Sequence, residues 1–118
     1  KQPELLRKIR TALENEDIAI SAITRGELLY GLELVPNATS LHIAVHAFLG
    51  YLPCLEWPVS AADHYGKLRA EQKTKGAPVG YMDTLIACHA LAENLILVTN
   101  NERDFSRIPG LQIENWAA

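Results

Sequence analysis

Hydrophobic positions along the chain follow two spacings, one typical of amphipathic helices and the other of short strands. In residues 3–14, apolar side chains recur at positions i, i+3 and i+7, and the lysine and arginines face away from them, which predicts a helix. Residues 17–23 alternate apolar and small side chains without a helical stripe, which predicts a short buried strand. The chain therefore opens with a helix followed by a strand.

The same order repeats along the rest of the chain. Further helices are predicted from Thr24 to the break at Pro36, over residues 40–49, from residue 60 to near Gly76, and over residues 82–93. Further strands are predicted over residues 54–57, 95–98 and 111–114. The strand at 95–98 is the most hydrophobic, so we expect it to be buried. Strands that alternate with helices predict an α/β fold with a mainly parallel sheet.

Composition narrows the class of protein. A length of 118 residues predicts a single domain over 1–118, and 48% hydrophobic with 21% charged residues excludes a disordered or fibrous chain. No apolar run approaches the ~20 residues of a membrane span, so no membrane contact is expected. A net charge of −3 gives no general attraction to nucleic acid. A nuclease that gathers carboxylates around a metal ion nevertheless remains compatible with this charge.

The two cysteines and four histidines give weak chemical signals. Cys54 and Cys88 form no C-x-x-C pair, which predicts a reducing, cytoplasmic environment and two buried thiols. His42 and His46 have a spacing that can bind zinc but lack the intervening glutamate of metalloproteases, so capping or solvation is the better interpretation. His89 lies in an apolar helix and is interpreted as a hydrogen-bonded core residue.

Acidic and amide side chains stand where predicted strands end or helices begin. Sites in parallel α/β sheets lie beyond the carboxyl ends of the strands. The candidate residues at such positions are Glu27, Asp83, Asn101 and Asp104. Carboxylate and amide oxygens suit Mg²⁺, which can polarise a phosphate and activate an attacking water. The pattern therefore favours a metal site that acts on a phosphate ester.

Each candidate also has a purely structural explanation. Glu27 completes a capping box with Thr24. Asp83 opens a helix, where a carboxylate suits the helix dipole. That helix is otherwise apolar, however, and a partly buried acid there costs free energy unless it is paired or metal-bound. Asn101 and Asp104 are residue types common in turns.

Several other enzyme classes lack their signatures. G-x-S-x-G, Walker and G-x-G-x-x-G sequences are absent, which argues against serine hydrolases, P-loop nucleotide hydrolases and dinucleotide-binding proteins. No Asp-x-Asp motif of a phosphohydrolase is present. Basic side chains that could touch phosphates are more simply interpreted as a solvated helix face. They are Arg25, Lys67, Arg69, Lys73 and Lys75.

Three segments, in order, resemble motifs of PIN-domain toxin ribonucleases of the VapC type. Residues 21–31 (SAITRGELLYG) are similar to their second acidic motif, and residues 78–87 (PVGYMDTLIA) to their third. Residues 98–105 (VTNNERDF), with the IPGL and NW sequences that follow, resemble their carboxyl-terminal signature. The match runs from about residue 18 to residue 116, which is most of the chain.

The resemblance implies a PIN-like three-layer α/β/α domain and an endoribonuclease that uses Mg²⁺ or Mn²⁺. Glu27 would be the second-motif acid and Asp83 the third-motif metal ligand, while Asn101 and Asp104 fall where the fourth acidic position varies. The substrate implied is RNA, with tRNA as one candidate. The partners implied are a cognate antitoxin and a second copy of the chain, in the cytoplasm.

One family motif is not found in these residues. The family begins with a strand that carries an aspartate, whereas this sequence starts at the helix that would follow it. We therefore expect such a strand upstream of Lys1 and expect the 118-residue polypeptide alone to be weakly active or inactive. The alternative interpretation is a non-catalytic binding module, whose apolar groove engages an antitoxin or another partner.

Overall fold

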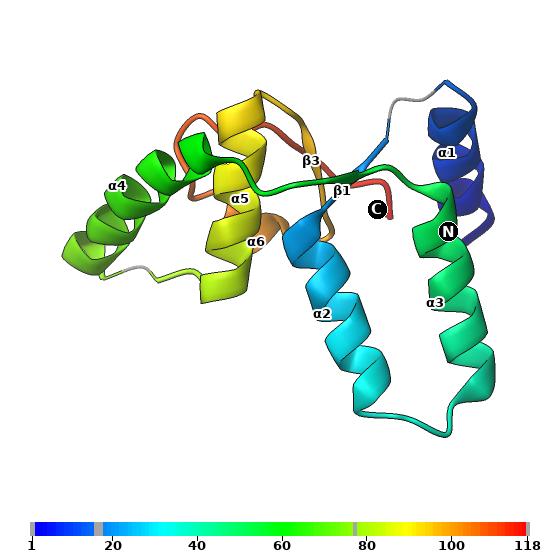
Figure 1. Cartoon of the computed structure of the whole chain (residues 1–118). Helices are drawn as coiled ribbons and strands as arrows, with labels where there is room; N and C mark the ends of the chain where they lie inside the picture. The colour runs from blue at the N-terminus through cyan, green and yellow to red at the C-terminus, as the bar shows by residue number, and fades with distance from the viewer. Residues whose placement is uncertain (1, 16–17, 77, 118) are drawn as a thin grey trace. The chain divides into compact units, whose positions relative to one another are not determined.

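The structure, a computed structural model, describes residues 2–15, 18–76 and 78–117 (Figure 1). The chain divides into two compact units, Lys1–Lys8 with Trp57–Ala118 and Ile9–Glu56. Each unit contains one pair of parallel strands, and residues of α1 (Gln2–Glu14) belong to both units. None of the helices in the described ranges has the length and apolar character of a membrane-spanning helix.

The unit Ile9–Glu56 is a helix pair beside a short parallel ladder. Strand β1 (Ile20–Ser21) pairs with β2 (Cys54–Leu55), and Ile20 lies opposite Cys54. Helices α2 (Ala22–Glu33) and α3 (Thr39–Tyr51) follow β1 and contact each other. The connection between them contains Pro36, which ends the first helix as the sequence predicts.

The other unit is built on two long helices that lie side by side (Figure 1). Helix α4 (Val59–Lys75) packs against α5 (Tyr81–Glu93). Ala61 and Ala87 are fully buried there, because small side chains let two helix backbones approach closely. The described core of this unit consists of Ala61, Leu68, Ala87, Cys88, Phe105 and Ile108.

Short elements complete this unit after α5. They are β3 (Leu97–Val98), the four-residue α6 (Glu102–Phe105) and β4 (Ile113–Glu114). Strand β4 pairs with β3 in parallel. Gly76 and Asn94 end α4 and α5 in the left-handed conformation, with φ of 63° and 55°, which suits their residue types.

A buried polar network holds the loop that leads into α5. Gln72 accepts a hydrogen bond from the backbone N–H of Val79 at 3.5 Å and donates to the Thr84 hydroxyl at 3.4 Å. The Thr84 hydroxyl in turn donates to the Gly80 carbonyl at 2.9 Å. Because Gly80 is the N-cap of α5, this network fixes the first turn of the helix, which contains Asp83.

The predicted helices and the α/β class with parallel pairing are confirmed, but each of the four predicted strands is shorter than expected and has only two residues. Of the strand predicted over 17–23, Asp17 lies outside the described residues and the observed strand covers Ile20–Ser21. It ends at Ser21 because the Ser21 hydroxyl caps α2 by accepting a bond from the Ile23 N–H. The strand predicted to be buried leaves Ile96 and Val98 50% and 41% exposed. Leu97 packs against the core, and its neighbours point the other way because successive strand residues face opposite sides.

The expectation of two buried thiols is also wrong. Cys88 is fully buried on α5, but Cys54, at the start of β2, is exposed. The two-residue ladder of β1 and β2 does not cover the side of β2 that Cys54 occupies. Burial raises the pKa of the Cys88 thiol from 9.0 to about 11. Cys88 therefore favours the folded state below about pH 9, and this contribution is lost as the pH rises towards 11.

We expect one fast-reacting thiol per folded chain. At mildly alkaline pH, Ellman's reagent should react rapidly with Cys54 and reach Cys88 only after unfolding in urea, because attack requires an accessible thiolate. Cys54→Ser should remove the fast phase completely. Two fast-reacting thiols in the folded protein would contradict the burial of Cys88.

Candidate active site

The structure brings three of the four candidate site residues together in the unit that contains α5 and α6. The side-chain amide of Asn101 donates to Asp83 Oδ2 at 3.4 Å and to Asp104 Oδ2 at 3.3 Å. One amide group thus lies between two carboxylates that come from different helices. Asp83 is 18 residues from Asn101 in the chain, so this arrangement is a product of the fold and not of local sequence.

Two helices position the three residues, α5 for Asp83 and α6 for Asn101 and Asp104. Asp83 lies in the first turn of α5, next to the fully buried Thr84. Asn101 is the N-cap residue of α6, and its backbone N–H donates to Thr99 Oγ1 at 3.0 Å. Asp104 lies within α6, next to Phe105, which is 3% exposed and packs in the core. Buried neighbours therefore position the two carboxylates and the amide.

The charges of this group favour a cation. Partial burial, and secondly the negative charge of Asp104, raise the pKa of the Asp83 carboxyl, and the hydrogen bond from Asn101 partly offsets this rise. Among the described residues, no lysine or arginine forms an ion pair with either carboxylate. A bound cation would relieve the repulsion that raises the pKa of Asp83.

The chemistry of the donors suits a hard divalent ion. Nowhere in the described ranges do three or more histidine, cysteine or acidic side chains come together in a way that could hold a metal ion. Two carboxylates beside an amide match Mg²⁺, which is commonly held by one or two protein carboxylates and keeps several waters. A soft or tetrahedral metal site has no candidate ligands here.

Glu27 lies in the unit Ile9–Glu56, on α2. The capping box predicted for it is wrong, because α2 begins at Ala22 with Ser21 as its N-cap, which leaves Glu27 in the second turn. Its side chain is exposed and caps no helix. Helix capping therefore does not explain why Glu27 is acidic. Its role in the site stays a prediction from the sequence.

Two of the histidines, His42 and His89, make contacts within the fold. The imidazole Nε2 of His42 lies 3.0 Å from the carbonyl oxygen of Val35, at the connection between α2 and α3. His46 is exposed. His89 is buried, and its Nε2 lies 3.4 Å from Glu93 Oε2 on the next turn of α5. The capping interpretation of His42 is thus the one that the structure supports.

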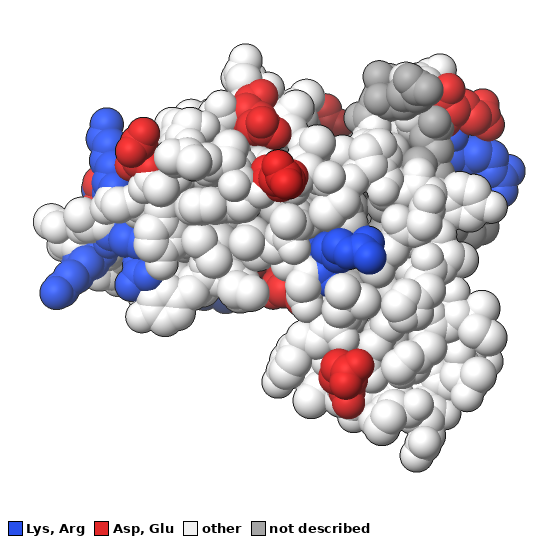
Figure 2. Space-filling model, in the orientation of Figure 1, with Lys and Arg blue, Asp and Glu red and all other residues white. Residues whose placement is uncertain are grey.

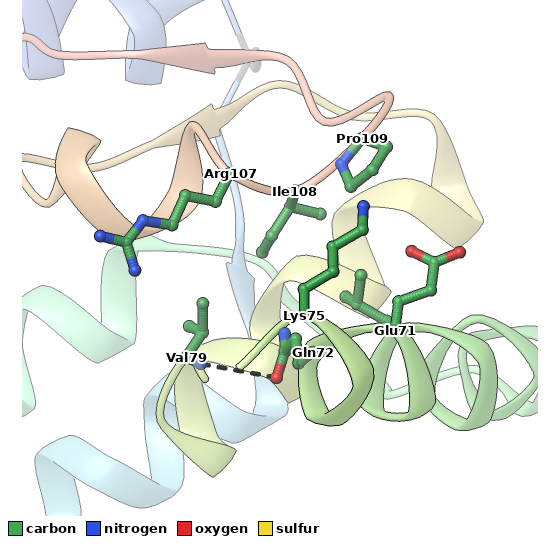
Figure 3. Close-up of a pocket in the computed structure, with 8 residues that line it drawn as sticks. Glu71, Gln72, Lys75, Val79, Arg107, Ile108 and Pro109 are labelled. Atoms are coloured by element: carbon green, nitrogen blue, oxygen red, sulfur yellow. Dashed lines mark hydrogen bonds between the residues drawn. The ribbon is translucent and has the colours of Figure 1, made fainter. Parts of the chain in front are cut away.

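A shallow hollow lies between the end of α4 and the segment after α6 (Figure 3). Its buried lining residues are Leu68, Gln72, Val79 and Ile108. Figure 3 shows Arg107 pointing away from Lys75 and Glu71. Asp83, Asn101 and Asp104 are not among its lining residues. The hollow is therefore separate from the acidic group and brings it no additional ligand.

Sequence reasoning missed one arrangement near the acidic group. Arg69 does not belong to a simply solvated helix face, because its guanidinium lies 4.1 Å from the centre of the Tyr81 ring and donates to the Tyr65 hydroxyl. Tyr65 and Arg69 are four residues apart on α4, and this spacing was the available signal for a side-chain pair. The contact with Tyr81 depends on the packing of α4 on α5 and leaves no signal in the sequence.

Comparisons with known proteins agree on one family. The family model described as "PIN domain" matches residues 1–111. The chain is 44% identical over 117 residues to tRNA(fMet)-specific endonuclease VapC of Salmonella typhimurium, which covers 98% of this chain and 86% of that protein. It is 42% identical over 103 residues to ribonuclease VapC2 of Rickettsia felis, which covers 87% of this chain and 77% of that protein.

Solved structures give the same result. The chain matches VapBC2 from Rickettsia felis, bound to a DNA fragment from its promoter, with a TM-score of 0.86 and 39% identity over 94% of this chain and 84% of that one. It matches DNA-bound VapBC from Salmonella typhimurium with a TM-score of 0.86 and 42% identity, over 98% and 87% of the two chains.

Proposed function

Because this chain belongs to the PIN-domain family, as a VapC-type ribonuclease toxin, we propose that Asp83, Asn101 and Asp104 form the site at which it cleaves RNA. The observation that carries the proposal is the single amide that bridges two carboxylates, neither of which is paired with a cation in the described residues. These residues also lie in the segments that resemble the third and carboxyl-terminal family motifs. Relatives described as tRNA(fMet)-specific endonucleases make tRNA(fMet) the proposed substrate, and hence the cytoplasm the proposed location.

We propose that Mg²⁺ or Mn²⁺ serves this site. When bound, the ion would supply Lewis-acid polarisation of the scissile phosphate and activation of the attacking water. Asp83 and Asp104 would hold it through their carboxylates, while Asn101 orients Asp83 through its hydrogen bond. Glu27 is proposed as an additional acid of the site, the second-motif acid that the family resemblance implies.

Binding of Mn²⁺ should stabilise the protein. At a Mn²⁺ concentration about 100 times its Kd, mass action adds ~2.7 kcal/mol, which corresponds to a rise in Tm of roughly 10 °C for a chain of this size. Differential scanning fluorimetry of the protein expressed from its native gene measures this shift. Asp83→Asn should abolish it, whereas the matched variant Asp63→Asn, at an exposed position of α4, should retain it. A wild-type protein that gains no stability from Mn²⁺ would favour the non-catalytic binding module.

We further propose that the antitoxin covers apolar side chains of the α2–α3 pair. Related structures include VapBC of a toxin–antitoxin family and a toxin–antitoxin complex, and the α2–α3 pair with its connection exposes several large apolar residues. They are Tyr30, Leu34, Val35, Leu41, Ile43, Phe48 and Tyr51. A homodimer remains part of the proposal. Light scattering of the toxin with and without co-expressed antitoxin distinguishes a dimer from a toxin–antitoxin complex.

A further inference from the structure

The guanidinium of Arg69 is fixed between two tyrosines at the start of α5. Its Nη1 donates to the Tyr65 hydroxyl at 2.6 Å, and its Cζ lies 5.5 Å from the centre of that ring. On the other side, Cζ lies 4.1 Å from the centre of the Tyr81 ring, within the range of a cation–π contact. A planar cation is thereby held in one orientation before any ligand arrives.

The positive charge of Arg69 and the exposed face of the Tyr81 ring remain available to a ligand. Among the described residues no carboxylate forms an ion pair with Arg69, and hydrogen bonding to Tyr65 and Tyr81 leaves several of its five N–H donors unused. Tyr81 is 65% exposed, although a large aromatic ring stabilises a fold mainly by being buried. If this cluster served only to hold α4 and α5 together, it would need neither a positive charge without an ion-pair partner nor an exposed aromatic ring.

The cluster lies beside the acidic group, across the end of one helix. Tyr81 and Asp83 both belong to the first turn of α5, and residues two positions apart do not share a helix face. The N-cap between the loop and this turn is Gly80, which has no side chain. A helix with its side chains is about 10 Å wide, so a strand whose phosphate lies at Asp83 would present a neighbouring nucleotide to Tyr81.

The helix that carries Arg69 is rich in basic side chains. Figure 2 shows lysine and arginine side chains, with fewer acidic ones, over α4. The sequence of α4 contains Lys67, Arg69, Lys73 and Lys75 against Asp63 and Glu71, an excess of two positive charges. The chain as a whole has a net charge of −3. A local basic helix next to an acidic site therefore supplies the attraction to phosphates that the rest of the molecule lacks.

From these observations, and resting on the proposed ribonuclease function, we propose that Arg69 and Tyr81 dock the nucleotide that neighbours the cleaved one. Arg69 binds its phosphate through the free N–H donors, and the exposed Tyr81 ring stacks on its base. Stacking on an aromatic ring is tolerant of sequence, because every base has a π-face. The pair therefore positions the strand and takes no part in bond cleavage.

The test measures binding without cleavage. In an Asp83→Asn background, expressed from the native gene, fluorescence anisotropy gives the Kd for fluorescein-labelled tRNA(fMet). Arg69→Gln and Tyr81→Ala should each raise this Kd by about 5–20-fold. Arg69→Gln should also reduce the slope of log Kd against log salt concentration by ~0.7, because one phosphate contact is lost.

Matched variants separate docking from a structural role. Lys8→Gln removes the same charge from an exposed position of α1, outside the basic helix, and should change the Kd by less than about twofold. Tyr81→Phe retains the ring and should bind more tightly than Tyr81→Ala. A clamp between helices would lower Tm without changing the salt slope. An Arg69→Gln variant with lowered Tm and an unchanged slope would therefore overturn the inference.

The experiments distinguish failure of the docking inference from failure of the proposed ribonuclease function. If the wild-type protein cleaves tRNA(fMet) while Arg69→Gln and Tyr81→Ala bind it as tightly as their parent, the docking inference is wrong and the ribonuclease function stands. If the wild-type protein neither binds nor cleaves RNA, both are overturned.

Discussion

Replacement of Asp83 by asparagine is expected to reduce RNA cleavage by on the order of 10³-fold, with the fold retained. Asparagine has the same shape, and its side-chain oxygen can still accept the hydrogen bond that Asn101 donates to Asp83. The substitution removes the negative charge that the proposed site offers to a divalent ion. The measurement is the rate of tRNA(fMet) cleavage by the protein expressed from its native gene, together with growth of cells that express it without antitoxin.

The stability of the same variant serves as its control. Because the pKa of Asp83 is raised in the folded protein, its ionised form costs folding free energy at neutral pH. Asp83→Asn should therefore be at least as stable as the wild type at neutral pH, and this advantage should vanish once the pH falls below the pKa of the carboxyl in the unfolded chain. An inactive variant that is clearly less stable at neutral pH would point to misfolding, and an active one would remove Asp83 from the site.

Glu27 can be tested in the same assay. Glu27→Gln leaves the Ser21 cap of α2 intact, because the helix begins well before Glu27. A loss of cleavage comparable with that of Asp83→Asn would support the role that the sequence resemblance implies. Wild-type cleavage by Glu27→Gln would leave Asp83, Asn101 and Asp104 as the whole of the proposed acidic group.

Local signals in the sequence were sufficient to predict helices α1 to α5 and to select the residues that meet at the acidic group. Helix α4 ends at Gly76 because glycine accepts the left-handed conformation found there. The position of Asp83 at the head of an apolar helix predicted a partly buried acid, and the structure confirms it. For the contact of Asp83 with Asn101, the sequence predicted only that both residues lie at the same edge of a parallel sheet.

The features that the sequence did not predict depend on competing local signals or on packing between distant segments. Ser21 and Thr24 both carry hydroxyls that can cap a helix, and periodicity alone did not show that α2 starts at the earlier one. The bridge formed by Asn101 requires α6, which has only four residues and no periodicity of its own. The stacking of Arg69 on Tyr81 joins two helices and follows from their packing.

Phe105→Ala is expected to lower the free energy of unfolding by about 3–5 kcal/mol, which is the usual cost of deleting a buried aromatic side chain. Phe105 is 3% exposed and belongs to the core that α4 and α5 share with the segment after β3. A domain of this size has a total stability of roughly 5–15 kcal/mol, so the loss would be a large fraction. Urea denaturation followed by circular dichroism measures it.

The same substitution should also disturb the acidic group. Helix α6 is too short to be stable in isolation, so burial of Phe105 is what holds Asp104 and the Asn101 cap against the body of the unit. Phe105→Leu should cost less than about 1.5 kcal/mol, since most of the apolar contact remains, and should retain Mn²⁺ binding. Val59→Ala, at a residue 88% exposed, should change stability by less than about 0.5 kcal/mol. If Phe105→Ala were as stable as Val59→Ala, core packing could not be what anchors α6, and the position of Asp104 would need another cause.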